Sequence, residues 1–156
     1  MCKKGKILME LKRIESFCVD HLKLLPGIYV SRKDEVGNTL VTTFDLRFIR
    51  PNFELSMTTA GIHTIEHLGA TYLRNREDIK SEVVYFGPMG CRTGFYLILK
   101  GDKEPEDIKA CIKDMLDFII EFEGDIPGAT AVECGNYLDN NLMEAKIYAK
   151  KYREIL

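Results

Sequence analysis

The sequence predicts a single α+β domain in which helices pack on a β-sheet as separate layers. Its 156 residues point to one domain. Segments with alternating hydrophobicity and segments with apolar residues at helical spacing follow each other without the strict strand–helix–strand repetition of a parallel sheet. The hydrophobic fraction of 46% and the charged fraction of 29% are typical of a globular domain that builds its own core.

Strands are expected where residues of high strand propensity run between turn-forming residues. The clearest is the segment 40–49, where alternation predicts one apolar and one polar face. The apolar positions are Phe44, Leu46 and Phe48, and the polar positions are Thr43, Asp45 and Arg47. The expected strands are 28–30, 40–49, 82–86, 94–99 and 129–134, with a turn at 36–38 and a glycine-rich loop at 87–94.

Three amphipathic helices are expected, each with recognisable boundary residues. A threonine can cap the first, a proline opens the second, and a glycine ends the second. The expected beginnings are Thr58 or Thr59, Pro105, and Asp139 or Asn140, and the expected ends are Arg76, Gly124 and the region of Leu156.

Charge and composition argue against several classes of function. The net charge of −2 gives no reason to expect a nucleic acid or an acidic membrane as partner. No segment has the roughly 20 apolar residues of a transmembrane helix, and the apolar run after the basic start is too short for a signal peptide. The five cysteines include no CxxC pair and are odd in number, unlike a disulfide framework. We therefore expect a cytoplasmic protein whose thiols stay free for metal binding or catalysis.

The motif His63-Thr64-Ile65-Glu66-His67 is the strongest chemical signal in the sequence. On a helix, this spacing puts both imidazoles on one face, about 5–6 Å apart at Cβ. Two nitrogens can then reach one ion at about 2.0–2.1 Å. Glu66 lies on the flank of that face, where it can act as general acid or base without ligating the metal. Such a pair also arises by chance on surfaces, but these are two of only three histidines in the chain.

A pair of helical histidines needs a third protein ligand, and catalysis needs an open position on the metal. The candidates besides His21 are the thiols of Cys134 and Cys91. Cys91 is followed by Arg92, a cation that favours a thiolate, so Cys91 is the better candidate for chemistry. Spacing alone leaves the division of roles between the two cysteines open.

Several separate segments of the sequence form a distinctive set. The segments are Glu15-Ser16-Phe17 with Asp20-His21, Phe44-Asp45-Leu46-Arg47-Phe48 with Pro51-Asn52, His63-Thr64-Ile65-Glu66-His67-Leu68, Pro88-Met89-Gly90-Cys91-Arg92-Thr93-Gly94, and Cys134-Gly135. Together they closely resemble the S-ribosylhomocysteine lyases, the LuxS family. Each segment is weak alone, whereas their joint order and spacing are highly specific. With this resemblance, residues 1–13 are expected to be an N-terminal extension and residues 14–156 a single metalloenzyme domain.

The resemblance implies helices packed on an antiparallel sheet and a homodimer with two sites at the subunit interface. It also implies one divalent metal per subunit, Fe(II) in the native enzyme and zinc or cobalt as replacements. The implied metal ligands are His63, His67 and Cys134.

The resemblance also implies roles for residues around the metal. Cys91 and Glu66 match the family's acid–base pair, and Arg47 matches a residue beside the catalytic cysteine and the substrate. Without the resemblance, the alternation predicts that Arg47 faces solvent and pairs with Asp45.

The implied substrate is S-ribosylhomocysteine, and the implied products are homocysteine and 4,5-dihydroxy-2,3-pentanedione, the precursor of the autoinducer-2 quorum-sensing signal. The thioether of the substrate resists direct attack by water. Moving the carbonyl along the ribose chain until it lies β to the sulfur makes elimination of the thiolate easy. Ser16 and His21 match substrate-contacting positions that the other subunit contributes, and Asp45 is also expected to bind substrate.

Two other classes of function compete with this interpretation. In a small metallohydrolase, the HxxEH arrangement would let Glu66 activate a water, and Cys91 would not be needed. The third ligand of such enzymes is normally a carboxylate. A non-catalytic metal-binding domain is the other class, but structural zinc sites usually close with four protein ligands, and this sequence offers three good candidates.

Overall fold

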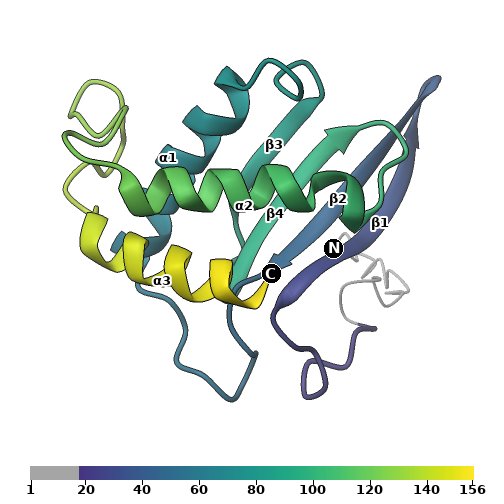
Figure 1. Ribbon diagram of the computed structural model, residues 1–156, viewed down its shortest axis with the longest axis horizontal. Helices are drawn as coiled ribbons and strands as arrows, with labels where there is room; N and C mark the ends of the chain where they lie inside the picture. Colours follow the sequence, from purple (N-terminus) through teal and green to yellow (C-terminus); the bar gives the residue numbers. More distant parts are fainter. Residues whose placement is uncertain (1–17) are drawn as a thin grey trace, which may run out of the picture.

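A four-stranded antiparallel sheet with three helices on one of its faces forms the fold (Figure 1). The computed structural model describes residues 18–156. Along the sheet the strands follow the order β1-β2-β4-β3. The elements are β1 (Gly27–Val36), β2 (Thr39–Arg47), α1 (Thr59–Asn75), β3 (Val83–Pro88), β4 (Gly94–Lys100), α2 (Pro105–Glu121) and α3 (Leu142–Ile155). The prediction of one α+β domain is confirmed.

The prediction that residues 1–13 are an extension concerns a part of the chain outside the described residues. None of the helices in residues 18–156 combines the length and the apolar character that crossing a membrane requires.

A tight hairpin joins β1 to β2. Gly37 has a φ of +62°, which matches a two-residue hairpin turn whose first central position requires glycine. β1 extends well beyond the expected residues 28–30 and contains a bulge between Val30 and Arg32. The bulge leaves Ser31 without a direct partner on β2.

Among the strands, the central pair β2 and β4 contributes most to the core. Phe44 and Leu46 of β2 are fully buried opposite Leu97 and Phe95 of β4. The other face of β2 differs from the simplest expectation, because Arg47 is only 3% exposed. A solvent-facing position for Arg47 is therefore wrong, although its pairing with Asp45 is confirmed.

Each helix begins at a side chain that caps its first turn. Thr58 caps α1 by accepting a hydrogen bond from the Gly61 amide, as expected. Pro105 is the first residue of α2, also as expected. The cap of α3 is Asn141, which accepts from the Glu144 amide. The expectation of Asp139 or Asn140 at this position is wrong by one or two residues.

The segment 129–134 is not a strand, which corrects the prediction of a short strand there. It forms turns, in which the amides of Glu133 and Cys134 both donate to the Thr130 carbonyl. Val132 is 97% exposed, so the apolar residues that suggested a strand have no core to cover. Local hydrogen bonds therefore decide the conformation of this segment.

Tyr152 ties α3 to the sheet, and its removal gives a test of the packing. Its hydroxyl donates to the Gly27 carbonyl at 2.7 Å, and its ring stacks on Phe48 with centroids 4.1 Å apart. Tyr152→Phe removes this part-buried hydrogen bond, so we expect a loss of about 1 kcal/mol in the free energy of unfolding. Urea denaturation at fixed metal content measures this loss in the free energy of unfolding. The matched change Tyr137→Phe at a partly exposed ring should stay within about 0.5 kcal/mol. Equal midpoints for the two variants would contradict this role.

Candidate metal centre and active site

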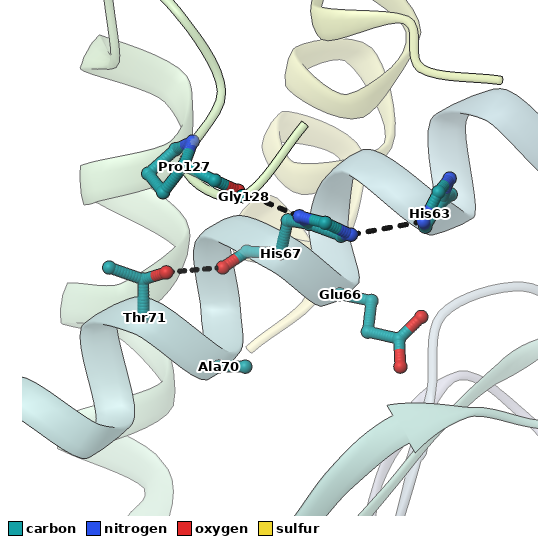
Figure 2. Close-up of a pocket in the computed structure, with 7 residues that line it drawn as sticks. All are labelled: His63, Glu66, His67, Ala70, Thr71, Pro127 and Gly128. Carbon is teal, nitrogen blue, oxygen red and sulfur yellow. Dashed lines mark hydrogen bonds between the residues drawn. The ribbon is translucent and has the colours of Figure 1, made fainter. Parts of the chain in front are cut away.

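The two histidines of α1 lie one turn apart and point toward the same spot. Their Nε2 atoms are 3.0 Å apart, and their ring centroids are 4.6 Å apart. Figure 2 shows both rings on one side of α1, with Glu66 extending from the helix between them. The helical spacing in the sequence thus produces a convergent pair of nitrogens.

Backbone carbonyls fix the tautomer of each ring. The Nδ1 of His63 donates to the Asp139 carbonyl at 2.8 Å, and the Nδ1 of His67 donates to the Pro127 carbonyl at 2.7 Å. Because a carbonyl only accepts, each neutral ring carries its hydrogen on Nδ1 and its lone pair on Nε2. Two lone pairs at this separation repel each other unless a cation lies between them. Two nitrogen ligands of one tetrahedral metal ion lie about 3.3 Å apart, which is close to the arrangement found here.

Cys134 supplies a third donor atom at the same spot. Its Sγ lies 3.4 Å from the Nε2 of His63, and the donor atoms of His63, His67 and Cys134 all lie within 4.8 Å of one another. The backbone amide of Asn136 donates to this sulfur, which supports a thiolate. Two imidazoles and one thiolate match a divalent transition metal and leave a fourth coordination position open.

The turn at Pro127 and Gly128 holds His67 from the side opposite the metal spot. Gly128 has a φ of +72°, and a Cβ at this position would lie 3.2 Å from the Nδ1 of His67. A side chain here would therefore be strained and would crowd the hydrogen bond that orients the imidazole. Sequence reasoning missed this support, although Pro-Gly is a recognisable turn signal.

Glu66 lines two cavities near the histidines. With His63 and His67 it lines a cavity of about 420 Å³, shown in Figure 2. With His63, Met89 and Gly90 it lines a second cavity of about 390 Å³. Glu66 therefore borders both the space beside the two imidazoles and the space beside the loop that carries Cys91.

Cys91 lies in a third cavity, of about 330 Å³, which also involves Met89 and Gly90. The cavity is lined by Val19, His21, Ser31, Asp45, Arg47, Met89, Gly90, Cys91 and Tyr96. Since Met89 and Gly90 border this cavity and the one beside Glu66, the two spaces are neighbours. Cys91 is exposed and is a free thiol, as a reacting group requires.

The loop that presents Cys91 is held by its own backbone. The Met89 amide donates to the Gly94 carbonyl, and the Arg92 amide donates to the Met89 carbonyl, both at 2.9 Å. Arg92 adopts a φ of +57°, which is uncommon for a residue with a side chain and sits directly after the thiol. The backbone on both sides of Cys91 is thus held in place.

A buried ion pair lies beneath Cys91. Arg47 donates to both carboxylate oxygens of Asp45, at 3.1 and 2.5 Å, and its Nη1 lies 3.9 Å from the Cys91 sulfur. Burial raises the pKa of Asp45, while the bonds to Arg47 oppose that rise. Burial and the neighbouring Asp45 charge also raise the pKa of Tyr96. Asp45 thus fixes the guanidinium in the position where it faces the thiol.

Comparisons with known proteins identify the family. The family model described as S-Ribosylhomocysteinase (LuxS) matches residues 14–155. The chain belongs to the LuxS family. It is 60% identical over 146 residues to the S-ribosylhomocysteine lyase of Finegoldia magna, covering 94% of this chain and 92% of the relative. It is 58% identical over 142 residues to the S-ribosylhomocysteine lyase of Clostridium beijerinckii, covering 91% of this chain and 89% of the relative.

Two of the residue groups expected from the resemblance to LuxS are gathered in space. His63, His67 and Cys134 form one group, and Cys91, Arg47, Asp45 and His21 line one cavity. Glu66 lines a neighbouring cavity with His63, Met89 and Gly90. Ser16 lies outside the described residues. His21 borders the Cys91 cavity of its own chain. The carbonyls of Asp139 and Pro127 carry no sequence signal, because any residue has a carbonyl and the loop conformation alone aims it.

The metal ligands can be tested by cobalt substitution. We expect the LuxS protein to bind one Co(II) per chain and to show a sulfur-to-cobalt charge-transfer band in its absorption spectrum. Cys134→Ala should lose the band, because the thiolate ligand is gone. Cys91→Ala is the matched control and should keep it. Loss of the band in the Cys91 variant alone would reverse the roles of the two cysteines.

Proposed function

We propose that the protein is an S-ribosylhomocysteine lyase that cleaves the thioether of S-ribosylhomocysteine to homocysteine and 4,5-dihydroxy-2,3-pentanedione. The observation that carries this proposal is a group of three convergent donor atoms, from His63, His67 and Cys134, near an exposed Cys91 thiol that lies beside a buried arginine. The near-full-length identity to proteins named for this lyase activity supports it.

The chemistry requires a carbonyl to move along the ribose chain before the carbon–sulfur bond breaks. Each shift removes a proton from one carbon and returns a proton to its neighbour. When bound, a divalent metal supplies the Lewis acid that polarises the sugar oxygen; we propose Fe(II) as the native ion, with zinc or cobalt able to replace it. The ligand set of His63, His67 and Cys134 leaves room for that oxygen, because it fills only three positions.

Cys91 serves as the base at carbon in this proposal. A thiolate is required for this role, and Arg47 and its neighbours provide the positive environment that favours one. After taking the proton from one carbon, the same sulfur can deliver it to the adjacent carbon. The fixed loop around Cys91 keeps the sulfur aimed at the substrate during both steps.

Glu66 moves the protons of the sugar oxygens. It borders both the space beside the two imidazoles and the space beside the Cys91 loop, so its carboxylate can reach oxygens of a ribose chain that spans the two cavities. The homocysteine part needs polar anchors for its amino and carboxylate groups. We assign these to Ser16, His21 and Asp45.

The enzyme works as a homodimer in the cytoplasm under this proposal. The segment before β1 carries Val19, Leu22 and Leu25, which are 46%, 61% and 54% exposed in the single chain. Apolar residues gathered in this way suit contact with a second subunit. His21 lies in the same segment, where its Nδ1 forms a local hydrogen bond with the Val19 carbonyl. The free thiols Cys91 and Cys134 require a reducing compartment.

The lyase proposal predicts that Cys91 is needed for turnover but not for metal binding. In anaerobically purified protein, Cys91→Ala and Glu66→Gln should each lower the rate of thiol release from S-ribosylhomocysteine by about 10²–10⁴-fold. Their metal content, measured by elemental analysis, should equal that of the wild type. Glu77→Gln, the same change at an exposed side chain, should leave the rate unaltered. Full activity of the Cys91 variant would instead favour a hydrolase that uses Glu66 alone.

A mixed dimer tests whether His21 acts across the interface. Chains with Cys91→Ala are combined with chains with His21→Ala, so that one site of each mixed dimer regains both groups only if the two subunits share it. We expect thiol release to return to at most about half of the wild-type rate, since one of two sites is restored. Each variant alone should stay inactive. A mixed dimer without activity would place His21 in the site of its own chain.

A further inference from the structure

We infer that Thr93 is a positioning residue that relays the charge of Arg47 to the Cys91 sulfur. The inference rests on the proposed role of Cys91 as base and adds a residue to it. The Thr93 hydroxyl lies between the two groups, 2.5 Å from Arg47 Nη1 and 3.1 Å from Cys91 Sγ. The direct separation of Arg47 Nη1 from the sulfur is longer, 3.9 Å.

The chemistry of the three groups sets the direction of the hydrogen bonds when Cys91 is a thiolate. A guanidinium has five donors and no acceptor, so the Thr93 oxygen must accept from Arg47. The hydroxyl has a single hydrogen, and among residues 18–156 the remaining hydrogen-bond partner of this oxygen is the Cys91 sulfur. A thiolate carries no hydrogen, so when Cys91 is ionised Thr93 must donate to the sulfur, and this hydrogen bond stabilises the thiolate relative to the thiol.

The relay begins at Asp45 and is held rigidly. Asp45 accepts two hydrogen bonds from Arg47, which leaves Nη1 of the guanidinium to Thr93. Thr93 is buried, and its carbonyl accepts from the amides of Phe48 and Ile49, at 3.0 and 3.2 Å. The hydroxyl is thus fixed by the ends of two neighbouring strands. Polarised chains of this kind strengthen each bond within them.

Other ionisable groups face the same space and must be considered in a titration. The cavity around Cys91 also contains His21, from the segment before β1, and Tyr96, from β4. Arg92 follows Cys91 directly in the loop. None of these groups changes when the Thr93 hydroxyl is removed, so a difference between variants reports on the relay.

The test compares the reaction of Cys91 with iodoacetamide in the zinc-loaded enzyme without substrate. Labelling of the Cys91 peptide is followed by mass spectrometry from pH 5 to 10. Thr93→Val keeps the shape but removes the hydroxyl. We expect Cys91 labelling at neutral pH to slow about tenfold and its half-maximal point to move up by about one pH unit. Thr93→Ser, which keeps the hydroxyl, should restore both values.

Thr43 offers a matched control on the same strand as Arg47. Thr43 is buried, and its hydroxyl has no hydrogen-bond partner within residues 18–156, so Thr43→Val removes an equivalent group outside the relay. It should label like the wild type. If Thr93→Val does not fold, Thr93→Ala compared with Thr93→Ser gives the same test. In turnover, Thr93→Val should lower kcat with KM within about twofold.

A wild-type labelling profile for the variants without the Thr93 hydroxyl would overturn the inference. Because labelling needs no substrate, its result is separate from the proposed reaction. A shifted profile in a protein that does not cleave S-ribosylhomocysteine would retain the relay and reject the lyase.

Discussion

The convergence of two imidazole lone pairs on one point is the constraint on which the rest of the site depends. The carbonyls of Asp139 and Pro127 force this convergence by taking the hydrogens on Nδ1. The repulsion between the two nitrogens is relieved when a cation binds them together with Cys134. The irregular segment between α2 and α3 thereby becomes part of the metal centre, because it supplies both carbonyls and the thiol. Its conformation and the metal are expected to stabilise each other.

The sheet also positions a buried cation, the Arg47 guanidinium, next to the Cys91 thiol. β2 ends at Arg47 and β4 begins at Gly94, and these two residues are paired across the sheet. A Cβ at Gly94 would lie only 2.2 Å from the Leu46 carbonyl, so this close approach requires glycine. The loop before β4 therefore delivers Cys91 directly above the buried guanidinium. α1 brings Glu66 and His63 next to the same loop between β3 and β4, where Met89 and Gly90 line a cavity with them.

Local patterns in the sequence predicted the parts of this arrangement that local physics determines. The helical motif from His63 to His67, the cap at Thr58 and the strand that contains Phe44 and Leu46 all appear as expected. The strand proposed for 129–134 failed because propensity alone does not provide a partner strand or a core. The burial of Arg47 was also missed by alternation, which describes two faces but not what covers each of them. The orientation of the backbone carbonyls toward the histidines depends on the conformation of a long loop. Residue types alone do not predict that orientation.

The most direct measurement of the central claim is X-ray absorption spectroscopy of the zinc-loaded protein. The account predicts a first shell of one sulfur at about 2.3 Å, two imidazole nitrogens at about 2.0–2.1 Å and one further light atom from solvent. A shell with two sulfurs would mean that Cys91 is also a metal ligand and is not free to act as a base. A shell without sulfur would mean that Cys134 does not ligate the ion that the two imidazoles bind. Either result would contradict an open, three-ligand centre beside a free reactive thiol.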